Sequence, residues 1–406
     1  MSTPDLRETV RDCAESWRDR LVELSHRLHA EPELAFEEHR SAAAIAELAE
    51  SAGFAVETGV GGLPTAFSAV RGSGELVIAF CAEYDALPGL GHACGHNVNG
   101  AAAVGAAIAL GAVADRLGVT VKLVGTPAEE DAGGKVYLIE AGLFDDVAAA
   151  MMVHADASDR VGFSSLAIGG WEIAYTGRAA HAAAAPWDGV NALDALTVAQ
   201  TSIGLLRQQL PRDCMVHGIV TEGGSAPNVI PDRAVARFEV RAASLERLRG
   251  LQARVRACFE AGALATGAEL RIEPRGKDFA DLRQDDGMSA IYAQAAEALG
   301  RTVSREPAVG GSTDMGNVSH LLPTIHPMIG YDTGGASQHT VEFAAAGTTP
   351  GADRAVLDGA IAMAWTAVGL ATDPVQRDRL LTGVRDRVSS GHASLRTAVP
   401  VPWDRR

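Results

Sequence analysis

The stretch LVIAFCAEYDALPGLGHACGHN, residues 76–97, decides the fold of this 406-residue chain. Its first part, residues 76–81, is an uninterrupted apolar run of strand length, which is typical of a strand buried on both faces of a parallel sheet. Carboxylates follow at once, and after them comes a Gly-rich segment that contains Cys94 and His96. We therefore expect an α/β domain with its chemistry at the carboxyl end of this strand.

The residues that follow this stretch alternate between helix and strand patterns. Residues 97–117 are Ala-rich and lack Pro, which favours a helix, and residues 119–124 form a second apolar run of strand length. A short helix is expected at 134–141 and a third strand at 148–153. This β-α-β-α-β order predicts a mostly parallel central sheet with right-handed crossovers.

The middle of the chain has a different pattern. Strands are expected at 171–178, 214–221, 233–241 and 269–273, with helices at 188–210 and 245–265. The order β-α-β-β-α-β is that of a ferredoxin-like module. Helix and strand patterns then return at 287–299, 324–329 and 352–371. We expect one α/β domain, formed by residues 1–168 and 282–406, that is interrupted by a smaller domain at 169–281.

The composition limits the classes of protein to consider. The 35 Lys and Arg residues are outnumbered by 51 Asp and Glu residues, which gives a formal net charge of −16 at pH 7. A binder of nucleic acid or of an anionic membrane needs a basic face, so neither partner is expected. The first ten residues lack the apolar core of a secretory signal, and five scattered cysteines do not indicate a disulfide framework. A cytoplasmic protein without a membrane span is therefore expected.

Ionisable residues follow each of the three predicted parallel strands. Cys94 and His96 come after the first strand, Glu129 and Glu130 after the second, and His154 after the third. Because the carboxyl ends of parallel strands face the same crevice, we expect these side chains to converge. A thiol, imidazoles and carboxylates together suit Zn²⁺ and tolerate Mn²⁺ or Co²⁺.

Each of these residues also has an ordinary structural explanation. A lone Cys is usually a small core residue, a lone His at a strand end is usually hydrogen-bonded, and a Glu pair is usually a solvated loop. The joint placement after three consecutive strands favours the metal site. The other cysteines lack such neighbours and are expected in the core; they are Cys13, Cys81, Cys214 and Cys258.

The motif EYDALPGLGHACGHN at 83–97, together with TPAEE at 126–130, resembles the M20 family of metallopeptidases and amidohydrolases, in its subfamily D. It is most similar to the group that contains aminobenzoyl-glutamate hydrolase subunits and the β-alanyl-lysine dipeptidase-like proteins. Supporting segments lie at 29–38, 177–194, 225–232, 311–319 and 339–343. The resemblance implies a zinc-peptidase-like catalytic domain and assigns the inserted domain as a lid that pairs two chains into a homodimer.

The resemblance also implies two divalent metal ions in each chain, Zn²⁺ or Mn²⁺ with Co²⁺ as a further candidate. Cys94 would bridge the ions as a thiolate. His96 and His154 would complete one metal, and Glu130 and His339 the other. The spacing of residues in the sequence does not by itself identify His339 as a ligand. His320 and His326 are expected to be structural.

The resemblance gives roles to five further residues. Glu129 would be the general base, and Asp85 would orient a histidine ligand through its other ring nitrogen. On the lid, His181, Asn228 and Arg241 match positions that reach the substrate or the developing oxyanion, and Arg241 could also clamp a substrate carboxylate.

The function expected is a dinuclear metal-dependent amidohydrolase that uses metal-activated water. Its substrate would be a small N-acyl amino acid, an aminobenzoyl-glutamate-like compound or a dipeptide-like compound. Two alternatives remain open: a thiol hydrolase with Cys94 as nucleophile, and a non-catalytic metal- or ligand-binding protein. A thiol enzyme would keep its activity after chelation, and a binding protein would have no need for the base Glu129.

Overall fold

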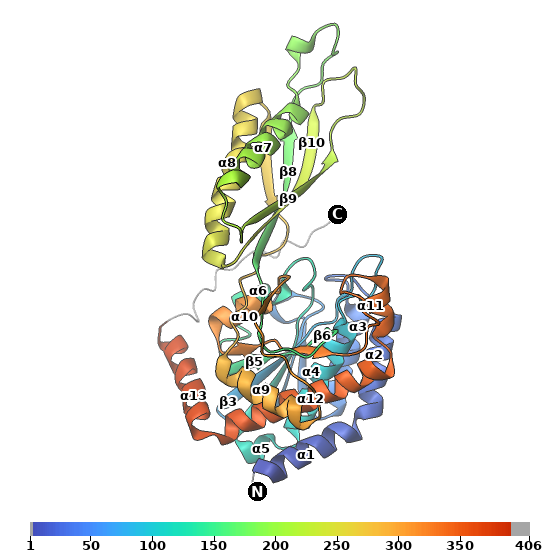
Figure 1. The fold of residues 1–406 in the computed structure, drawn as a ribbon, viewed down its shortest axis with the longest axis vertical. Coiled ribbons are helices and arrows are strands. Elements are labelled where there is room, and N and C mark those ends of the chain that lie inside the picture. Colours follow the sequence, from blue (N-terminus) through green and yellow to red (C-terminus); the bar gives the residue numbers. More distant parts are fainter. Residues whose placement is uncertain (1–2, 391–406) are drawn as a thin grey trace. The chain divides into compact units, whose positions relative to one another are not determined.

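The computed structural model describes residues 3–390, which divide into two compact units (Figure 1). Unit 1 contains the described residues of Met1–Ser164, Leu282–Gly310 and Asn317–Arg406, and unit 2 contains Ser165–Asp281 and Gly311–Gly316. One α/β unit is thus interrupted by a smaller one. The first part of unit 1 ends at Ser164, and the six residues Gly311–Gly316 group with unit 2.

Unit 1 is built on a six-stranded sheet. Its strands, in sheet order, are β1 (Ala55–Thr58), β2 (Phe67–Gly72), β4 (Val119–Gly125), β3 (Leu76–Ala82), β5 (Ala149–Met151) and β13 (Thr324–Ile325). The last four run parallel, whereas β2 is antiparallel to both β1 and β4. All seven residues of β3 are buried, as the uninterrupted apolar run predicted. The mostly parallel central sheet is confirmed.

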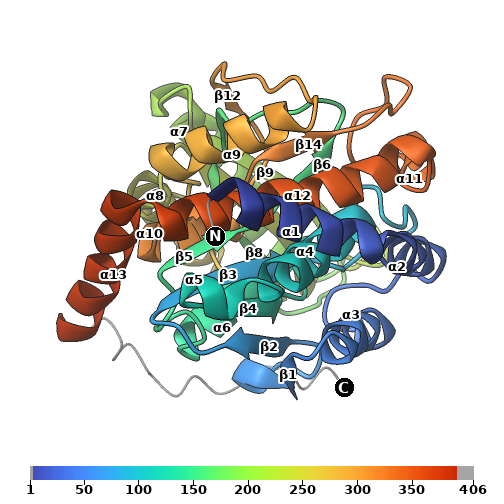
Figure 2. The same cartoon turned by 90° about the horizontal axis from the view of Figure 1, so that it is seen from below.

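Helix α4 (His96–Gly111) forms the centre of unit 1, and every one of its residues is buried. It packs against β3 and β4 on one side and against α12 (Pro350–Thr372) and α1 (Thr3–Ser16) on the other (Figure 2). A Cβ added at Gly105 would lie 2.9 Å from Ala360 Cβ, so glycine permits this close approach of α4 and α12.

The remaining elements of unit 1 complete its helical layers and short sheets. They are α2 (Arg18–Ala30), α3 (His39–Ser51), α5 (Ala114–Leu117), α6 (Gly134–Glu140), β6 (His154–Asp156), β7 (Phe163–Ser164), α9 (Asp286–Ala298), β12 (Ala308–Val309), α10 (Met315–Leu321), β14 (Met328–Gly330), α11 (Val341–Ala346) and α13 (Pro374–Ser389). The first residues of α10 belong to unit 2. Sequence patterns did not predict α1–α3, the β1–β2 pair, β6, β7, β12, α10, α11 or α13.

Two predicted elements of unit 1 are divided in the structure. The helix expected at 97–117 ends at Gly111 and resumes as α5. The strand expected at 324–329 is two strands, because β13 pairs with β5 whereas β14 pairs with β6. Pro327 lies between them and has no N–H to continue a ladder. The strand expected at 148–153 likewise ends at Met151.

Helix α12 is long and apolar enough to cross a membrane by length and composition, but 89% of its apolar window is buried inside the structure. It is a core helix of unit 1. Among the other cysteines Cys81 is buried as expected, whereas Cys13, Cys214 and Cys258 are half-buried residues at the edge of the cores.

Unit 2 is an antiparallel sheet with two helices. Its elements are β8 (Ala167–Thr176), α7 (Ala192–Leu206), β9 (Met215–Glu222), β10 (Arg233–Ala242), α8 (Leu245–Thr266) and β11 (Glu269–Pro274). This is the predicted β-α-β-β-α-β order, and the sheet order is β11-β8-β10-β9. Trp171, Phe238 and Phe259 pack in the core of the unit. Strand β9 lies at a sheet edge and exposes Ile219, which is 63% accessible.

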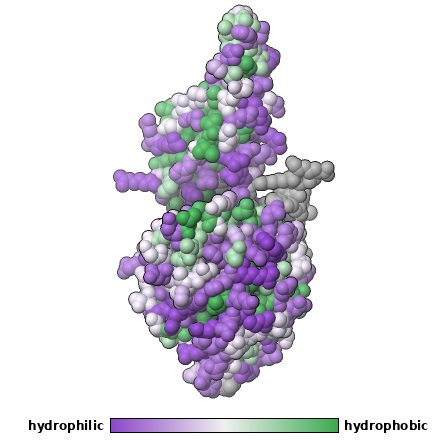
Figure 3. Space-filling model, turned by 90° about the vertical axis from the view of Figure 1, so that its right-hand side faces the viewer, coloured by the Kyte–Doolittle hydropathy of each residue, from purple (hydrophilic) through white to green (hydrophobic). Residues whose placement is uncertain are grey.

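Both units carry exposed hydrophobic side chains. Hydrophilic residues predominate on the face shown in Figure 3, with smaller hydrophobic groups between them. Exposed examples are Trp187 and Leu264 in unit 2 and Val375 in unit 1. Scattered apolar residues of this kind are normal for a globular protein.

Candidate metal centre

The ends of three parallel strands bring the predicted ligands together. In the sheet, Ala82 at the end of β3 is paired with Gly125 at the end of β4, and Phe80 is paired with Met151 of β5. The loops that leave these strands therefore start side by side. Residues 83–96, 126–130 and 152–154 follow from them, as the parallel order predicted.

The predicted ligands form two overlapping groups. Cys94 Sγ lies 3.8 Å from His154 Nε2 and 3.5 Å from His339 Nε2. His339 Nε2 lies 3.6 Å from Glu130 Oε2, and His96 Nε2 lies 3.9 Å from Glu130 Oε1. The donor atoms of Cys94, His96 and His154 lie within 4.8 Å of one another, as do those of Cys94, Glu130 and His339. Cys94 is common to both groups.

The donor atoms of this cluster fit a bound cation. His96 Nε2 and Glu130 Oε1 are buried and have no hydrogen-bond partner within the described residues 3–390. Buried polar atoms are normally paired, since an unpaired one costs its full desolvation. A cation between the two groups would satisfy both atoms.

Asp85 makes hydrogen bonds with two of the predicted ligands, His96 and Glu130. Its Oδ1 and its carbonyl oxygen lie 3.0 and 2.9 Å from His96 Nδ1, so a proton on that nitrogen leaves Nε2 free to face the other donors. Its Oδ2 accepts the N–H of Glu130 at 2.9 Å. The carboxylate of Asp85 therefore positions one predicted ligand from each of two strand ends.

Burial and neighbouring charges shift the pKa values of three residues of the cluster. Burial and then the charge of Glu130 raise the pKa of the Cys94 thiol well above its usual range. Burial also raises the pKa of Glu130. Burial opposes the charged form of His96, but the hydrogen bond and charge of Asp85 outweigh it and raise the pKa of this histidine. A thiol in this setting becomes a thiolate only beside a cation.

Glu129 stands next to the ligand groups. Its side chain is buried, and its Oε2 lies 3.9 Å from His96 Nε2. The residue before it, Ala128, has a φ of 59°, and His339 has a φ of 64°. Residues with a Cβ rarely adopt this left-handed conformation, and such strain is concentrated at functional sites.

Several residues of the site were not assigned from the sequence. Glu83 accepts a hydrogen bond from Lys135 Nζ at 2.6 Å in a fully buried ion pair, and its other oxygen lies 3.5 Å from His96 Nε2. Gln338 Nε2 donates to the carbonyl of Ala155 at 2.8 Å, next to His154. The position of Glu83 directly after β3 was a usable signal, whereas Gln338 lies in a loop without regular spacing.

Two histidines expected to be structural also lie in unit 1. The ring of His326 lies 5.2 Å from that of His154, at the end of β13. Burial lowers the pKa of His326 to about 3, so it is a neutral, packed side chain. His320 lies in the last turn of α10.

The three predicted substrate contacts lie on unit 2. His181 is exposed, and its Nδ1 accepts the N–H groups of Ala183 and Ala184 at 3.2 and 3.1 Å. Asn228 lies beside it, because its carbonyl accepts the N–H of Ala182 at 3.0 Å. Arg241, on β10, donates to Ser312 Oγ at 3.1 Å. The first two share one part of unit 2, and the third lies on its sheet.

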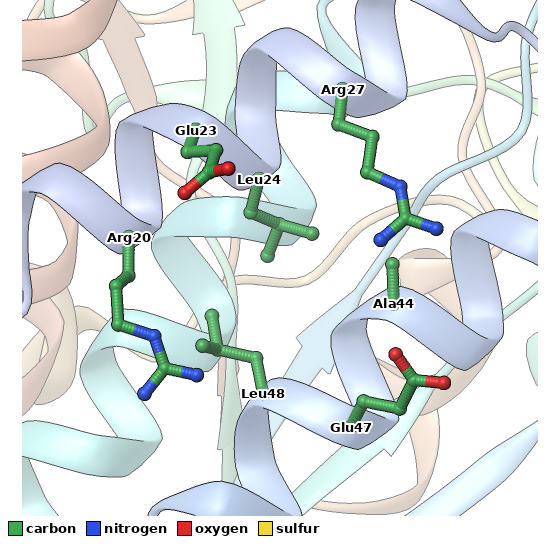
Figure 4. A pocket seen from close by; sticks show the side chains of 7 residues that line it. All are labelled: Arg20, Glu23, Leu24, Arg27, Ala44, Glu47 and Leu48. Carbon is green, nitrogen blue, oxygen red and sulfur yellow. The ribbon is translucent and has the colours of Figure 1, made fainter.

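A separate groove of about 200 Å³ lies between α2 and α3 (Figure 4). Leu24, Ala44 and Leu48 are buried apolar residues of its lining. Its charged lining residues are of both signs; they are Arg20, Glu23, Arg27 and Glu47. None of the predicted ligands lines this groove, so it does not belong to the metal centre.

The chain is similar to known proteins over most of its length. The model of peptidase family M20/M25/M40 matches residues 79–353. The Xaa-Arg dipeptidase of Mus musculus is 40% identical over 388 residues, which cover 90% of this chain and 88% of the relative. A p-aminobenzoyl-glutamate hydrolase subunit of Escherichia coli is 36% identical over 288 residues, or 66% of this chain and 59% of the relative. The crystal structure of a dinuclear metal-binding peptidase of the M20 family from Bacillus subtilis has a TM-score of 0.66 at 24% identity, and the match covers 88% of this chain and 99% of that one.

Proposed function

Because the chain belongs to peptidase family M20/M25/M40 and is a hydrolase of peptide or amide bonds, we propose that it is a dinuclear metal-dependent amidohydrolase. The predicted likeness to the aminobenzoyl-glutamate hydrolase and dipeptidase group is confirmed by both relatives. The observation that supports two metals is the shared position of Cys94 in two groups of three donors.

The proposed ligand sets follow these groups. Cys94 would belong to both ligand sets, His96 and His154 would complete one, and Glu130 and His339 would complete the other. Zn²⁺ or Mn²⁺ suits this mixture of thiolate, imidazole and carboxylate, and Co²⁺ is a further candidate. Two divalent ions bound there would lower the pKa of a water molecule and polarise the scissile carbonyl.

The side chains around the ligands carry out the proton transfers in this proposal. The carboxylate of Glu129 takes a proton from the attacking water and gives it to the leaving amine. The carboxylate of Asp85 keeps His96 in the tautomer that leaves Nε2 as a donor of electrons. Burial of Glu129 keeps bulk water from competing for the proton.

Unit 2 is proposed to be the lid and the dimerisation domain. Since His181 Nδ1 accepts two backbone N–H groups, Nε2 carries the ring proton and is a donor suited to a developing oxyanion. Asn228 offers an amide next to it, and Arg241 a guanidinium that suits a substrate carboxylate. The edge strand β9, with Ile219 exposed, suits pairing with a second copy of the chain into a homodimer.

The names of the relatives point to the class of substrate. One relative is named for dipeptides that end in Arg, the other for p-aminobenzoyl-glutamate. We therefore propose a small N-acyl amino acid, aminobenzoyl-glutamate-like or dipeptide-like substrate, cleaved in the cytoplasm. The net charge of −16 gives no support to a nucleic-acid or anionic-membrane partner.

A hydrolysis screen after controlled metal loading tests the proposal. The protein is stripped with a chelator, reloaded with Mn²⁺ or Zn²⁺, and offered Xaa-Arg dipeptides, N-acyl amino acids and p-aminobenzoyl-glutamate. We expect turnover that disappears on chelation and returns on reloading. Activity that survives chelation would favour the Cys94 thiol hydrolase, which the raised pKa of the thiol disfavours. Metal binding without turnover of any substrate would favour a binding protein.

A further inference from the structure

The turn that carries Glu129 is held in a strained shape. Ala128 has a φ of 59°, although it is not a glycine. Its carbonyl accepts the N–H of Ala132 at 3.2 Å and that of Gly133 at 2.8 Å. Gly134 packs so closely that an added Cβ would lie 1.9 Å from the carbonyl oxygen of Pro127. The hydrogen bonds from the loop after Glu129 therefore hold the carbonyl group of Ala128 in place.

The amide side of Ala128 is held by a residue from another part of unit 1. Its N–H donates to Glu38 Oε1 at 2.8 Å, across 90 positions of sequence. Glu38 precedes α3 and is fully buried. Burial and then the charge of Asp85 raise the pKa of the Glu38 carboxyl to about 8, so near pH 7 it is largely protonated and keeps an oxygen that accepts this hydrogen bond.

We propose that Glu38 is a positioning residue for the general base: its Oε1 holds Ala128 in the left-handed conformation that aims the Glu129 carboxylate at the metal centre. The inference rests on the proposed function, because it takes Glu129 as the base. Without the acceptor, Ala128 can relax to a negative φ, and this rotation of the backbone redirects Glu129. Glu38 itself does not touch the reacting atoms.

The first test compares two substitutions at this position in the full-length, metal-loaded protein. Glu38→Ala removes the acceptor and is expected to lower kcat by about 10- to 100-fold, as small misplacements of catalytic groups do. KM and metal content are expected to stay as in the wild type. Glu38→Gln keeps an oxygen acceptor of the same shape and is expected to retain most of the turnover. Glu37→Ala, at the exposed neighbouring position, is the matched control.

A second substitution separates positioning from a general role in stability. Glycine adopts a positive φ without strain, so Ala128→Gly is expected to restore much of the kcat lost in Glu38→Ala. If Glu38 only stabilised the fold, the added glycine would not recover kcat. Equal loss in Glu38→Ala and Glu38→Gln, or a fall in metal content in both, would overturn the inference.

A third measurement does not depend on activity. Hydrogen exchange at the Ala128 amide is expected to rise in Glu38→Ala and to stay slow in Glu38→Gln and Glu37→Ala. If the wild type hydrolyses no substrate, the proposed function fails, while this exchange still reports whether Glu38 holds the turn. Unchanged exchange in Glu38→Ala would overturn the positioning role even in an active enzyme.

Discussion

The two units hold their candidate residues in opposite ways. In unit 1 Cys94, His96 and His154 are buried and face one another. In unit 2 His181 and Asn228 are exposed, and the hydrogen bonds given above connect them to their own neighbours. The first set can therefore hold a metal ion without further residues, as proposed above. In the proposed function, the second set acts only when a substrate or another chain contacts it.

The difference follows from the two kinds of sheet. Parallel strands place their carboxyl ends at one edge, so one unit can collect ligands from several loops. The antiparallel sheet of unit 2 has alternating strand directions, and Arg241 lies along a strand rather than at a shared edge. Substitutions in unit 1 should therefore disturb metal binding and chemistry, and those in unit 2 should disturb turnover alone.

The largest effect is expected from Cys94→Ser. A neutral hydroxyl balances little charge between two cations, so most of the bound metal should be lost and activity with it. Elemental analysis of the purified variant measures this directly. Cys258→Ser, at a half-buried position of unit 2, should keep the wild-type metal content. Two metals per chain in Cys94→Ser would refute the bridging role.

Glu129→Gln should separate chemistry from metal binding within unit 1. The amide cannot accept the proton of water, so kcat should fall by about 10²-fold or more. Metal content and thermal stability should be preserved, because the shape of the side chain is unchanged. Asp131→Asn, an exposed acid two residues away, is the control and should remain active. Near-normal turnover in Glu129→Gln would show that another group is the base.

His181→Ala tests the outward-facing donors of unit 2. Loss of one oxyanion donor is expected to lower kcat by about 10²-fold with the metal content intact. If the histidine acts in the neighbouring protomer, mixing His181→Ala with Glu129→Gln should restore about a quarter of the sites after random exchange of chains. The readout is activity after exchange has been verified. A monomeric, fully active wild type, or no recovery in the mixed dimer, would exclude action across the dimer.

The same contrast explains what could be predicted from the sequence. The apolar run at 76–81 predicted the sheet, and the residues after each strand were enough to place four of the five proposed ligands in one cluster, since topology brings strand ends together. His339 was assigned only from the family resemblance, because it lies in a loop with a φ of 64° and follows no regular spacing.

Glu38 and Gln338 were missed for a related reason. Their contacts with Ala128 and Ala155 join distant segments through single hydrogen bonds, which leave no periodic pattern. The direct contacts of His181 and Asn228 with substrate stay proposals, because exposed donors on one unit do not reveal what they meet. Sequence patterns therefore predict the residues that the sheet topology brings together at its strand ends. They do not predict hydrogen bonds between single residues of distant segments.

The smallest expected effect is on the pH dependence of the unfolding free energy, and it concerns the buried acid Glu38 of unit 1. Its pKa of about 8 in the folded state exceeds the ordinary 4.5, so between these values folding takes up a proton that the unfolded chain lacks. The contribution of this group to the unfolding free energy is therefore full below about pH 4.5 and is lost as pH rises through 8. Glu38→Gln, measured by denaturant unfolding in the presence of chelator, should lose less stability than the wild type between pH 5 and about 8.

Asp278→Asn is the comparison in unit 2, where burial also raises the pKa of the carboxyl but to a smaller degree. Parallel pH profiles for the wild type and Glu38→Gln would show that this carboxyl is already ionised in the folded protein.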